Sequence, residues 1–259
     1  MKGVLKTISV FAWILVLASM LAPLMPLPDP NAVELGQRLM PPFVNGHVLG
    51  TDLLGRDLLA RLLSGTRTSL LVAIAATCVS LIAGTCIGIT SGFYGGKTDT
   101  VLMRGVDLVM AFPYLVFALA IVAVLGPGIG NALMAIAVVN VPFFARTVRG
   151  AALELAQSRY VEASRALGAS NARLVLFHLL PNLSPTLLTA CGTTFSWMLL
   201  ETAGLSFIGL GAQPPHADLG TMLSDSRRLM LVHPLSPLIP GLALVLLAVS
   251  GNLLAARRT

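Results

Sequence analysis

Charged side chains are scarce in this chain of 259 residues. Asp, Glu, Lys and Arg together make up 11% of it, whereas a soluble domain carries about 25%. Apolar residues make up 56%, and the mean hydropathy is +0.86. A water-soluble protein of this size could not bury so much apolar surface. The composition therefore excludes a soluble globular domain, a disordered chain and a collagen-like repeat, and it predicts an integral membrane protein.

Residues that bind metals or form disulfides are also few. The three cysteines lie inside apolar runs at spacings that match no zinc, haem or disulfide pattern, so we expect small packing residues: Cys78, Cys86 and Cys191. The spacing of the histidines defines no metal site either. The net charge of +6 comes from cations in short loops between apolar runs. These cations indicate membrane topology, and no nucleic-acid partner is expected.

Six apolar stretches are long enough for a membrane-crossing helix, which takes about 20 residues. One charge-free interval, from Asp107 to Arg146, is too long for a single helix and contains a turn-forming run at residues 126–131. Lys2 and Lys6 precede the first stretch as in a signal peptide, but prolines follow it instead of a cleavage site. The predicted spans lie near residues 8–25, 69–92, 106–125, 131–148, 184–205 and 236–256.

The distribution of Lys and Arg predicts the orientation of these spans. With both termini in the cytoplasm, 11 of these cations lie inside and 6 outside, as the positive-inside rule favours. The fold class is thus an all-α membrane protein with six transmembrane helices, N-in and C-in. Residues 26–67 form the predicted extracytoplasmic segment and residues 149–181 the predicted cytoplasmic loop, within a single transmembrane domain spanning 1–259.

Small residues recur every four positions along the second span. On a helix they form one stripe that lets another backbone approach closely, which predicts a helix–helix interface, with a pore-lining face as the alternative. The stripe consists of Ala76, Ser80, Gly84, Gly88, Gly92 and Gly96.

The cytoplasmic loop carries the most informative pattern. Its middle is rich in helix-forming Ala, Leu, Glu and Arg, Gly168 then interrupts it, and Ser170 or Asn171 can cap a second helix. Helix, glycine and helix predict a compact protrusion, which is more order than a tether between two spans needs.

This loop resembles the EAA loop of ABC-importer permease subunits. That motif has Glu-Ala-Ala, a glycine after three further residues, and later Leu-Pro. This chain matches with Ser164 in place of the second Ala and His178 in place of an Ile. The matching positions are Glu162, Ala163, Ser164, Gly168, Leu180 and Pro181.

A second segment extends the resemblance to the dipeptide, oligopeptide and nickel permeases of the DppC/OppC type. It resembles their "LGTDxxGRD" sequence through Gly50, Asp52, Gly55, Arg56 and Asp57. Further matches follow in family order over nearly the whole chain. The C-terminus departs from the family, because it stops where other members continue into a longer tail.

The resemblance implies a type I importer fold and a subunit of a larger assembly in the bacterial inner membrane. The expected partners are a second permease subunit of the DppB/OppB type, two ATP-binding subunits that hold the ATP and Mg, an extracytoplasmic substrate-binding protein, and membrane lipid. This chain itself is expected to hold no cofactor. The expected cargo is peptide, with nickel or a metal chelate as the alternative.

The resemblance also assigns roles to residues. The loop is the expected coupling helix that docks on an ATPase, through Tyr160, Glu162, Ala163, Ser164, Gly168, Ala169, Leu180 and Pro181. Apart from the resemblance, ionisable side chains near membrane spans mark pathways or helix contacts, so the candidates for the pathway or its gate are Glu201 and Asp107, together with Met198. For Asp107, pairing with Arg104 is the simpler explanation, and Glu201 has an interfacial position as its alternative.

Residues 50–57 leave two interpretations open. Their glycine spacing is that of a P-loop, but the required Lys-Ser/Thr is absent, so the chain is not expected to hydrolyse ATP. We expect a scaffold on the outer face, with Asp52 and Asp57 pairing with Arg56 or Arg61 or capping a helix. The alternative is a dock for the binding protein, formed by Gly50, Asp52, Gly55, Arg56 and Asp57.

Two other function classes fit the sequence less well. A membrane-embedded hydrolase would need a nucleophile motif, and residues 204–209 only approach Gly-x-Ser-x-Gly. A secondary transporter or channel would need charged residues at mid-membrane or an inverted repeat, and neither is clear in the sequence.

Overall fold

The computed structural model describes residues 2–230 and 235–256, and over these residues it is all-helical. Its longer helices are α1 (Lys2–Leu21), α2 (Leu58–Tyr94), α3 (Gly96–Met110), α4 (Tyr114–Leu125), α5 (Ile129–Ala156), α8 (Leu180–Phe207) and α10 (Leu235–Ala256). The shorter ones are α6 (Arg159–Ala166), α7 (Asn171–Arg173), α9 (Leu219–Ser226), a π-helical stretch (Leu174–Leu179) and the 3-10 turns Ala22–Leu24, Leu35–Gln37 and Arg227–Leu229.

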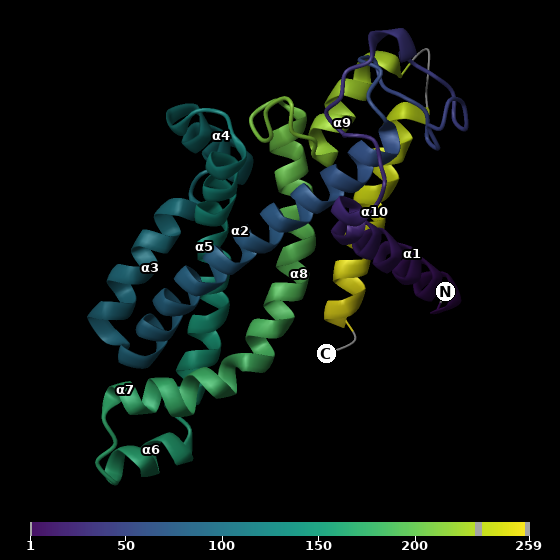
Figure 1. The fold of residues 1–259 in the computed structure, drawn as a ribbon. Helices are drawn as coiled ribbons and strands as arrows, with labels where there is room; N and C mark the ends of the chain where they lie inside the picture. The colour runs from purple at the N-terminus through teal and green to yellow at the C-terminus, as the bar shows by residue number, and fades with distance from the viewer. Residues whose placement is uncertain (1, 231–234, 257–259) are drawn as a thin grey trace.

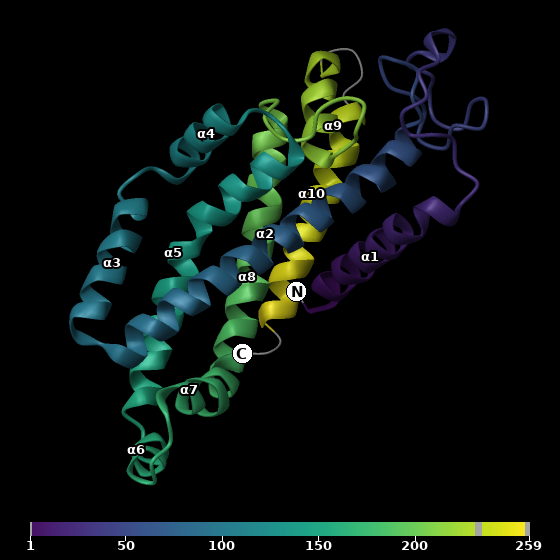
Figure 2. The same cartoon turned by 60° about the vertical axis from the view of Figure 1, so that its left-hand side comes forward.

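The long helices run between two ends of the molecule. The protrusion formed by α6 and α7 lies at one end, and the outer segment (residues 26–57) lies with α9 at the other (Figures 1 and 2). Among the described residues, five helices are long and apolar enough to cross a membrane, and the bent pair α3 and α4 makes a possible sixth crossing. The predicted all-α membrane fold is confirmed.

The span expected at residues 106–125 is not one straight helix, and here the structure corrects the prediction. α3 already begins at Gly96, ends at Met110, and is followed by α4 at an angle of 88°. Pro113 explains the break, because proline lacks a backbone N–H and disfavours helical geometry in the residue before it. The result is a broken span or a re-entrant segment.

Two expected boundaries also move. α2 begins at Leu58, capped by Asp57, whose carboxylate accepts a hydrogen bond from the Ala60 N–H at 2.7 Å. Residues 58–67 are therefore helical and the outer segment ends at residue 57. At the other end of the molecule α5 continues to Ala156, so the first part of the expected cytoplasmic loop is a continuation of that helix.

The small-residue stripe of α2 packs against α5. A side chain added at Gly84 would meet Phe144 Cβ at 2.4 Å, and one added at Gly88 would meet the Ala145 carbonyl oxygen at 2.6 Å. Ser80 donates its hydroxyl hydrogen across the same contact to the Ala137 carbonyl oxygen at 2.8 Å. The stripe is thus a helix–helix interface. Gly96 lies outside it, at the start of α3 with open space around it.

Candidate functional site

The α6–α7 protrusion is held to the helices by few side chains. Val161 is the buried residue of α6, and it packs in the cluster that contains Ile89 of α2 and Val148 of α5. The guanidinium of Arg165 lies over the Phe93 ring, 5.7 Å from its centre, a cation–π contact. These contacts seat α6 on the ends of α2 and α5, so a force on α6 acts directly on both helices.

Gly168 ends α6 through its backbone conformation. Its φ is +87°, a region that glycine enters without the penalty of a side chain. The Gly168 N–H donates to the Arg165 carbonyl oxygen at 3.0 Å, and the Ala169 N–H donates to the Ser164 carbonyl oxygen at 3.1 Å. This pair of bonds is a Schellman motif. Ser170 then accepts from the Arg173 N–H at 3.3 Å and caps α7.

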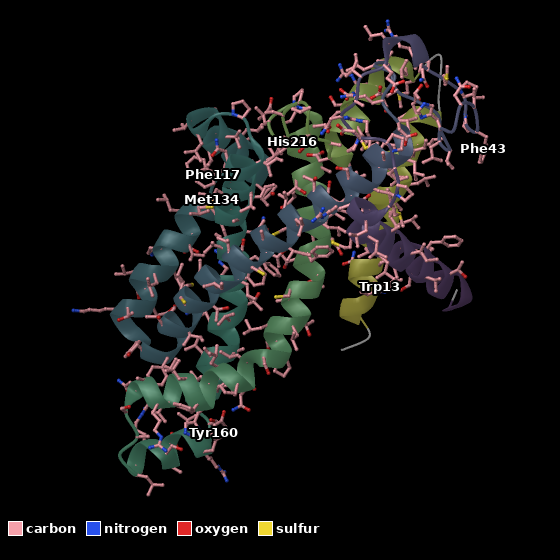
Figure 3. The ribbon with its side chains drawn as sticks, viewed as in Figure 1. Trp13, Phe43, Phe117, Met134, Tyr160 and His216 are labelled. Atoms are coloured by element: carbon pink, nitrogen blue, oxygen red, sulfur yellow. The ribbon has the colours of Figure 1, made fainter. Side chains whose placement is uncertain are left out.

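The far surface of the protrusion is exposed. Tyr160, Glu162 and Ala163 face outward, with Tyr160 41% exposed at this end of the molecule (Figure 3). Leu167, just before the glycine, is 90% exposed. Sequence reasoning did not select Leu167, although an apolar residue next to a helix-ending glycine in a polar segment is a detectable signal. An exposed leucine of this kind is a ready contact for a protein partner.

The second half of the expected coupling motif lies beside the first. Leu180 and Pro181 begin α8 directly after the π-helical stretch Leu174–Leu179, and Pro181 has no backbone N–H to continue the helical bonds at that point. The ring of His178, just before them, lies 6.3 Å from the ring of Tyr160. Ala169 packs against the buried cluster that holds Val161. The structure therefore brings the two sequence-distant parts of the motif to one surface.

Two of the three pathway candidates, Met198 and Asp107, make contacts within the chain that the sequence did not predict. Met198 is fully buried, and its sulfur accepts a hydrogen bond from the Thr77 hydroxyl at 3.2 Å. It is therefore a core residue between α2 and α8 and lines no surface in this conformation. Asp107 accepts a hydrogen bond from Arg146 on α5 at 2.6 Å, and not from Arg104 as the sequence favoured. The partner differs because α5 lies alongside α3.

A second ion pair joins the same two helices. Arg149 donates two hydrogen bonds to the Asp99 carboxylate, at 2.5 and 2.6 Å, and Ser91 of α2 donates a third. This pair was not selected from the sequence, since its partners are far apart in the chain. Together with the pair between Asp107 and Arg146, it fixes α3 against α5.

Glu201, the third pathway candidate, has only neutral hydrogen-bonding neighbours. The side-chain amide of Asn140 on α5 donates to Glu201 Oε2 at 3.0 Å. No ion pair within residues 2–230 and 235–256 includes this carboxylate. The side chain is partly exposed, so Glu201 remains the candidate that can face a pathway.

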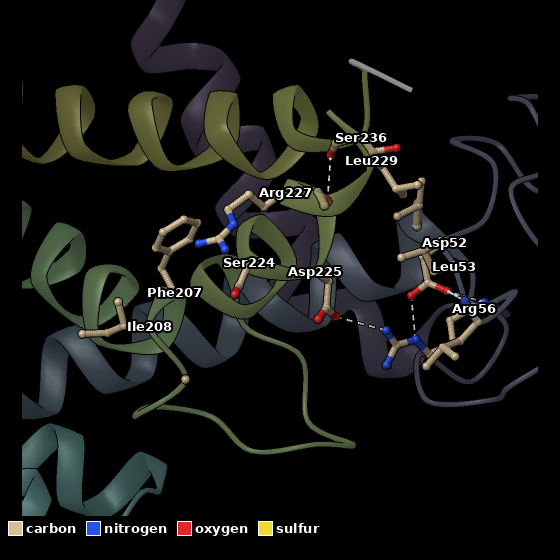
Figure 4. Close-up of a pocket in the computed structure, with 14 residues that line it drawn as sticks. Asp52, Leu53, Arg56, Phe207, Ile208, Ser224, Asp225, Arg227, Leu229 and Ser236 are labelled. Atoms are coloured by element: carbon tan, nitrogen blue, oxygen red, sulfur yellow. Dashed lines mark hydrogen bonds and ion pairs between the residues drawn. The ribbon is translucent and has the colours of Figure 1, made fainter. Parts of the chain in front are cut away.

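The outer segment is anchored by a cluster of charges. Asp52 accepts from the backbone N–H of Arg56 at 2.9 Å and from its guanidinium Nε at 2.6 Å. Arg56 also reaches Asp225 of α9 at 3.2 Å (Figure 4). Arg61 lies 3.6 Å from Asp52 and donates to the Pro30 carbonyl oxygen at 3.1 Å. The cluster joins the outer segment, the start of α2 and α9.

The remaining residues of this motif also serve local packing. Gly50 and Gly55 have positive φ, and a side chain on them would come within 2.3 Å of Met40 O and 1.9 Å of Glu34 O, respectively. Asp57 caps α2 and also contacts His47 Nδ1 at 2.7 Å. This geometry supports the scaffold interpretation. It leaves the exposed rim of the same region, including the 55%-exposed Asp225, as the part that a partner could reach.

Comparison with known proteins identifies the family to which this chain belongs. Residues 84–257 match the family "Binding-protein-dependent transport system inner membrane component". The probable D,D-dipeptide transport system permease protein DdpC of Escherichia coli K12 is 38% identical, over 95% of this chain and 83% of its own length. The chain belongs to this family. The predicted relationship to dipeptide and nickel permeases is thereby confirmed, and the chain is an inner-membrane transport subunit.

Other relatives agree with this assignment. The nickel transport system permease protein NikC of Escherichia coli K12 is 39% identical over 87% of this permease and 81% of its own length. An inward-facing structure of the MetNI methionine ABC transporter superposes with a TM-score of 0.61 at 20% identity, covering 77% of this chain and 96% of that one. At 20% identity, this superposition shows a shared fold alone.

The serine considered for a hydrolase has a structural role in this permease. Ser206 donates to the Asp218 carboxylate at 2.5 Å and accepts from the Ala212 N–H at 3.4 Å. Asp218 also caps α9 by accepting from the Thr221 N–H. Burial raises the pKa of Asp218, against the opposing effect of these hydrogen bonds. Ser206 thus holds the end of α8 against α9. Within the described residues no group of three or more His, Cys, Asp or Glu could hold a metal ion.

Proposed function

We propose that this permease forms, with a second permease subunit, the path by which an ABC importer carries peptides across the inner membrane. An extracytoplasmic binding protein delivers the peptide, and two separate ATPase subunits bind ATP and Mg. The names of the relatives support peptide as cargo, since DdpC and the dipeptide permease DppC of Alkalihalophilus pseudofirmus are both 38% identical. NikC, at 39%, supports nickel as the second candidate.

The exposed α6–α7 protrusion carries this proposal. Val161 and the Arg165–Phe93 contact fix its inner face to α2 and α5, while its outer face offers Tyr160, Glu162 and Leu167 to a partner. When two ATPases close around ATP, a docked helix of this kind moves as a rigid body. The movement reaches α5 and α8 directly, because the protrusion connects their ends.

Reconstitution of the whole assembly tests the proposal. The permease pair, both ATPases and the binding protein are placed in proteoliposomes, and uptake of radiolabelled dialanine and of Ni²⁺ is measured with and without ATP. We expect ATP-dependent uptake of dialanine. Uptake of Ni²⁺ alone would select the second candidate, and uptake that continues without the ATPases would contradict the importer mechanism.

A crosslink tests the contact itself. With the native cysteines replaced by alanine, a single cysteine is introduced by Ala163→Cys, and a second is placed on the ATPase surface that faces it. We expect crosslinking between the two subunits in the purified assembly. The matched control is Ala120→Cys on α4, which is also exposed and which should give no crosslink. Equal crosslinking at both positions would contradict a specific dock.

A further inference from the structure

Glu201, in a membrane-spanning helix, forms no ion pair with residues 2–230 or 235–256. Among these residues the carboxylates that pair with an arginine are Asp52, Asp99, Asp107 and Asp225. Glu201 accepts a hydrogen bond from the side-chain amide of Asn140 at 3.0 Å, and the Tyr114 hydroxyl lies beside it. A charged carboxylate in such a place is costly, and a cation that approaches it during function lowers that cost.

Threonine hydroxyls and apolar side chains together line a surface between α5 and α8. A shallow hollow of about 550 Å³ lies between α5 and α8, and Thr147, Thr189 and Thr193 contribute to its wall. The Thr147 hydroxyl donates to the Phe143 carbonyl oxygen at 2.9 Å, and the Thr189 hydroxyl to the Pro185 carbonyl oxygen at 3.0 Å. Because these hydrogens are used within each helix, the hydroxyl oxygens have only acceptor capacity left.

Glu201 and the hollow lie along the same pair of helices, α5 and α8. Asn140, which donates to Glu201, and Thr147, which lines the hollow, are seven residues apart on α5. That spacing places them on one face of the helix, two turns apart. The carboxylate therefore lies along the α5–α8 contact beyond the hollow, toward the end of α8 that meets α9.

We propose that Glu201 receives the positively charged group of the cargo as it passes through the permease. The proposal rests on the proposed function and specifies what its pathway recognises. An ammonium group has three donors and no acceptor, so it matches a carboxylate followed by acceptor-only hydroxyls. A divalent nickel ion is also attracted to a carboxylate by its charge, although imidazole nitrogen suits it better as a ligand. The shared chemistry is a cation, which a peptide supplies by its amino terminus and a chelate by its metal.

Charge neutralisation tests the proposal in the complete assembly. Glu201→Gln keeps the shape and the hydrogen bond from Asn140 but removes the charge. We expect uptake of dialanine, or of Ni²⁺ if that is the ion imported, to fall by about tenfold or more. Stimulation of ATP hydrolysis by the loaded binding protein should stay at the wild-type level, because the coupling surface is untouched. Glu154→Gln, which neutralises an exposed carboxylate of α5, is the matched control and should leave uptake unchanged.

Charge rescue separates recognition of a cation from a structural role. In a chain whose native cysteines are replaced by alanine, Glu201→Cys is treated with a methanethiosulfonate carrying either a sulfonate or a trimethylammonium group. We expect the sulfonate to restore uptake and the trimethylammonium to leave it low. Equal effects of the two reagents would overturn the proposal, as would normal uptake by Glu201→Gln.

Two further outcomes identify other roles for the carboxylate. If Glu201→Gln loses the second permease subunit on purification, Glu201 pairs with a cation of that subunit, and the proposal is overturned. If the unmodified assembly imports neither dialanine nor Ni²⁺ with ATP, the proposed function fails, and this inference fails with it. A failure of the inference alone is recognised by normal, ATP-driven uptake in the variant.

Discussion

The outer segment and the α6–α7 protrusion lie at opposite ends of this permease and are held in opposite ways. The outer segment is fixed by ion pairs, in which buried arginines reach the nearby Asp52 and the sequence-distant Asp225. The protrusion is fixed by local backbone bonds and by one buried side chain in α6. The difference indicates that the outer segment completes its own packing, whereas the protrusion leaves most of its surface for another subunit.

The largest effect is expected from Gly168→Pro, in the protrusion. Proline holds φ near −65° and cannot adopt the +87° of this position, so α6 loses its C-terminal bonds. ATP-driven uptake should fall by about tenfold or more, in line with the cost of displacing a positioned element, while the amount of chain in the membrane is unchanged. Uptake by Gly168→Ala should lie between uptake by Gly168→Pro and uptake by the control Gly105→Ala. Gly105 has open space around it. Wild-type uptake by Gly168→Pro would show that the backbone bend at the end of α6 is not needed for transport.

The second-largest effect is expected from Arg56→Met in the outer segment, which should lower the stability of the chain. It removes one of the two buried arginines beside Asp52 and leaves Arg61 at 3.6 Å, so we expect a loss of about 2 kcal/mol of unfolding free energy. Denaturant unfolding of the purified chain measures the loss, and protease cleavage within residues 26–57 should accelerate. The control is Arg67→Met, since Arg67 is exposed on α2, which follows the outer segment. Similar losses from both variants would show that the cluster does not anchor the segment.

Leu167→Ser tests whether the exposed surface of the protrusion serves binding and not stability. The side chain is 90% exposed, so the unfolding free energy of the chain alone should not change. Affinity for the ATPases should fall by about tenfold, or about 1.4 kcal/mol, measured by titration in detergent. The contrasting variant is Leu174→Ser, which is buried and should destabilise the chain itself. Unchanged ATPase affinity in Leu167→Ser would remove Leu167 from the dock.

The smallest effect concerns pH at the outer end. Burial raises the pKa of Asp218 in the folded chain above its unfolded value of about 3.9. The folded state therefore binds this proton more tightly, and the stability gained is complete below the unfolded pKa and is lost as pH rises through the folded one. The difference in unfolding free energy between wild type and Asp218→Asn should decrease between pH 4 and 7. A difference independent of pH would contradict the shift.

Local sequence signals predicted the local features well. Apolar runs of sufficient length gave the membrane fold, and the four-residue stripe gave the α2–α5 contact, because a helix repeats its faces at a known period. The glycine at the end of α6 and the capping serine were visible because each depends on neighbours in the chain. The break at Pro113 was equally local, and the prediction of one continuous span there gave too little weight to proline.

Contacts between distant residues could not be predicted in the same way. The sequence offered Arg104 as a partner for Asp107, because it lies one turn away, but the packing of α3 on α5 supplied Arg146. Met198 looked like a pathway residue on a span, and only its neighbours on α2 show that it is core. The pair between Asp99 and Arg149 is separated by 50 residues, and no spacing rule connects them.

The sequence by itself determined that this protein is a helical membrane permease with a glycine-bent protrusion, because hydropathy, proline and glycine act over a few residues. The tertiary structure decided which charges meet, which side chains are buried, and that Glu201 meets only neutral groups among the residues that the structure describes. Those outcomes depend on how helices pack against one another, and the energy of an ion pair depends on the distance and burial that this packing creates.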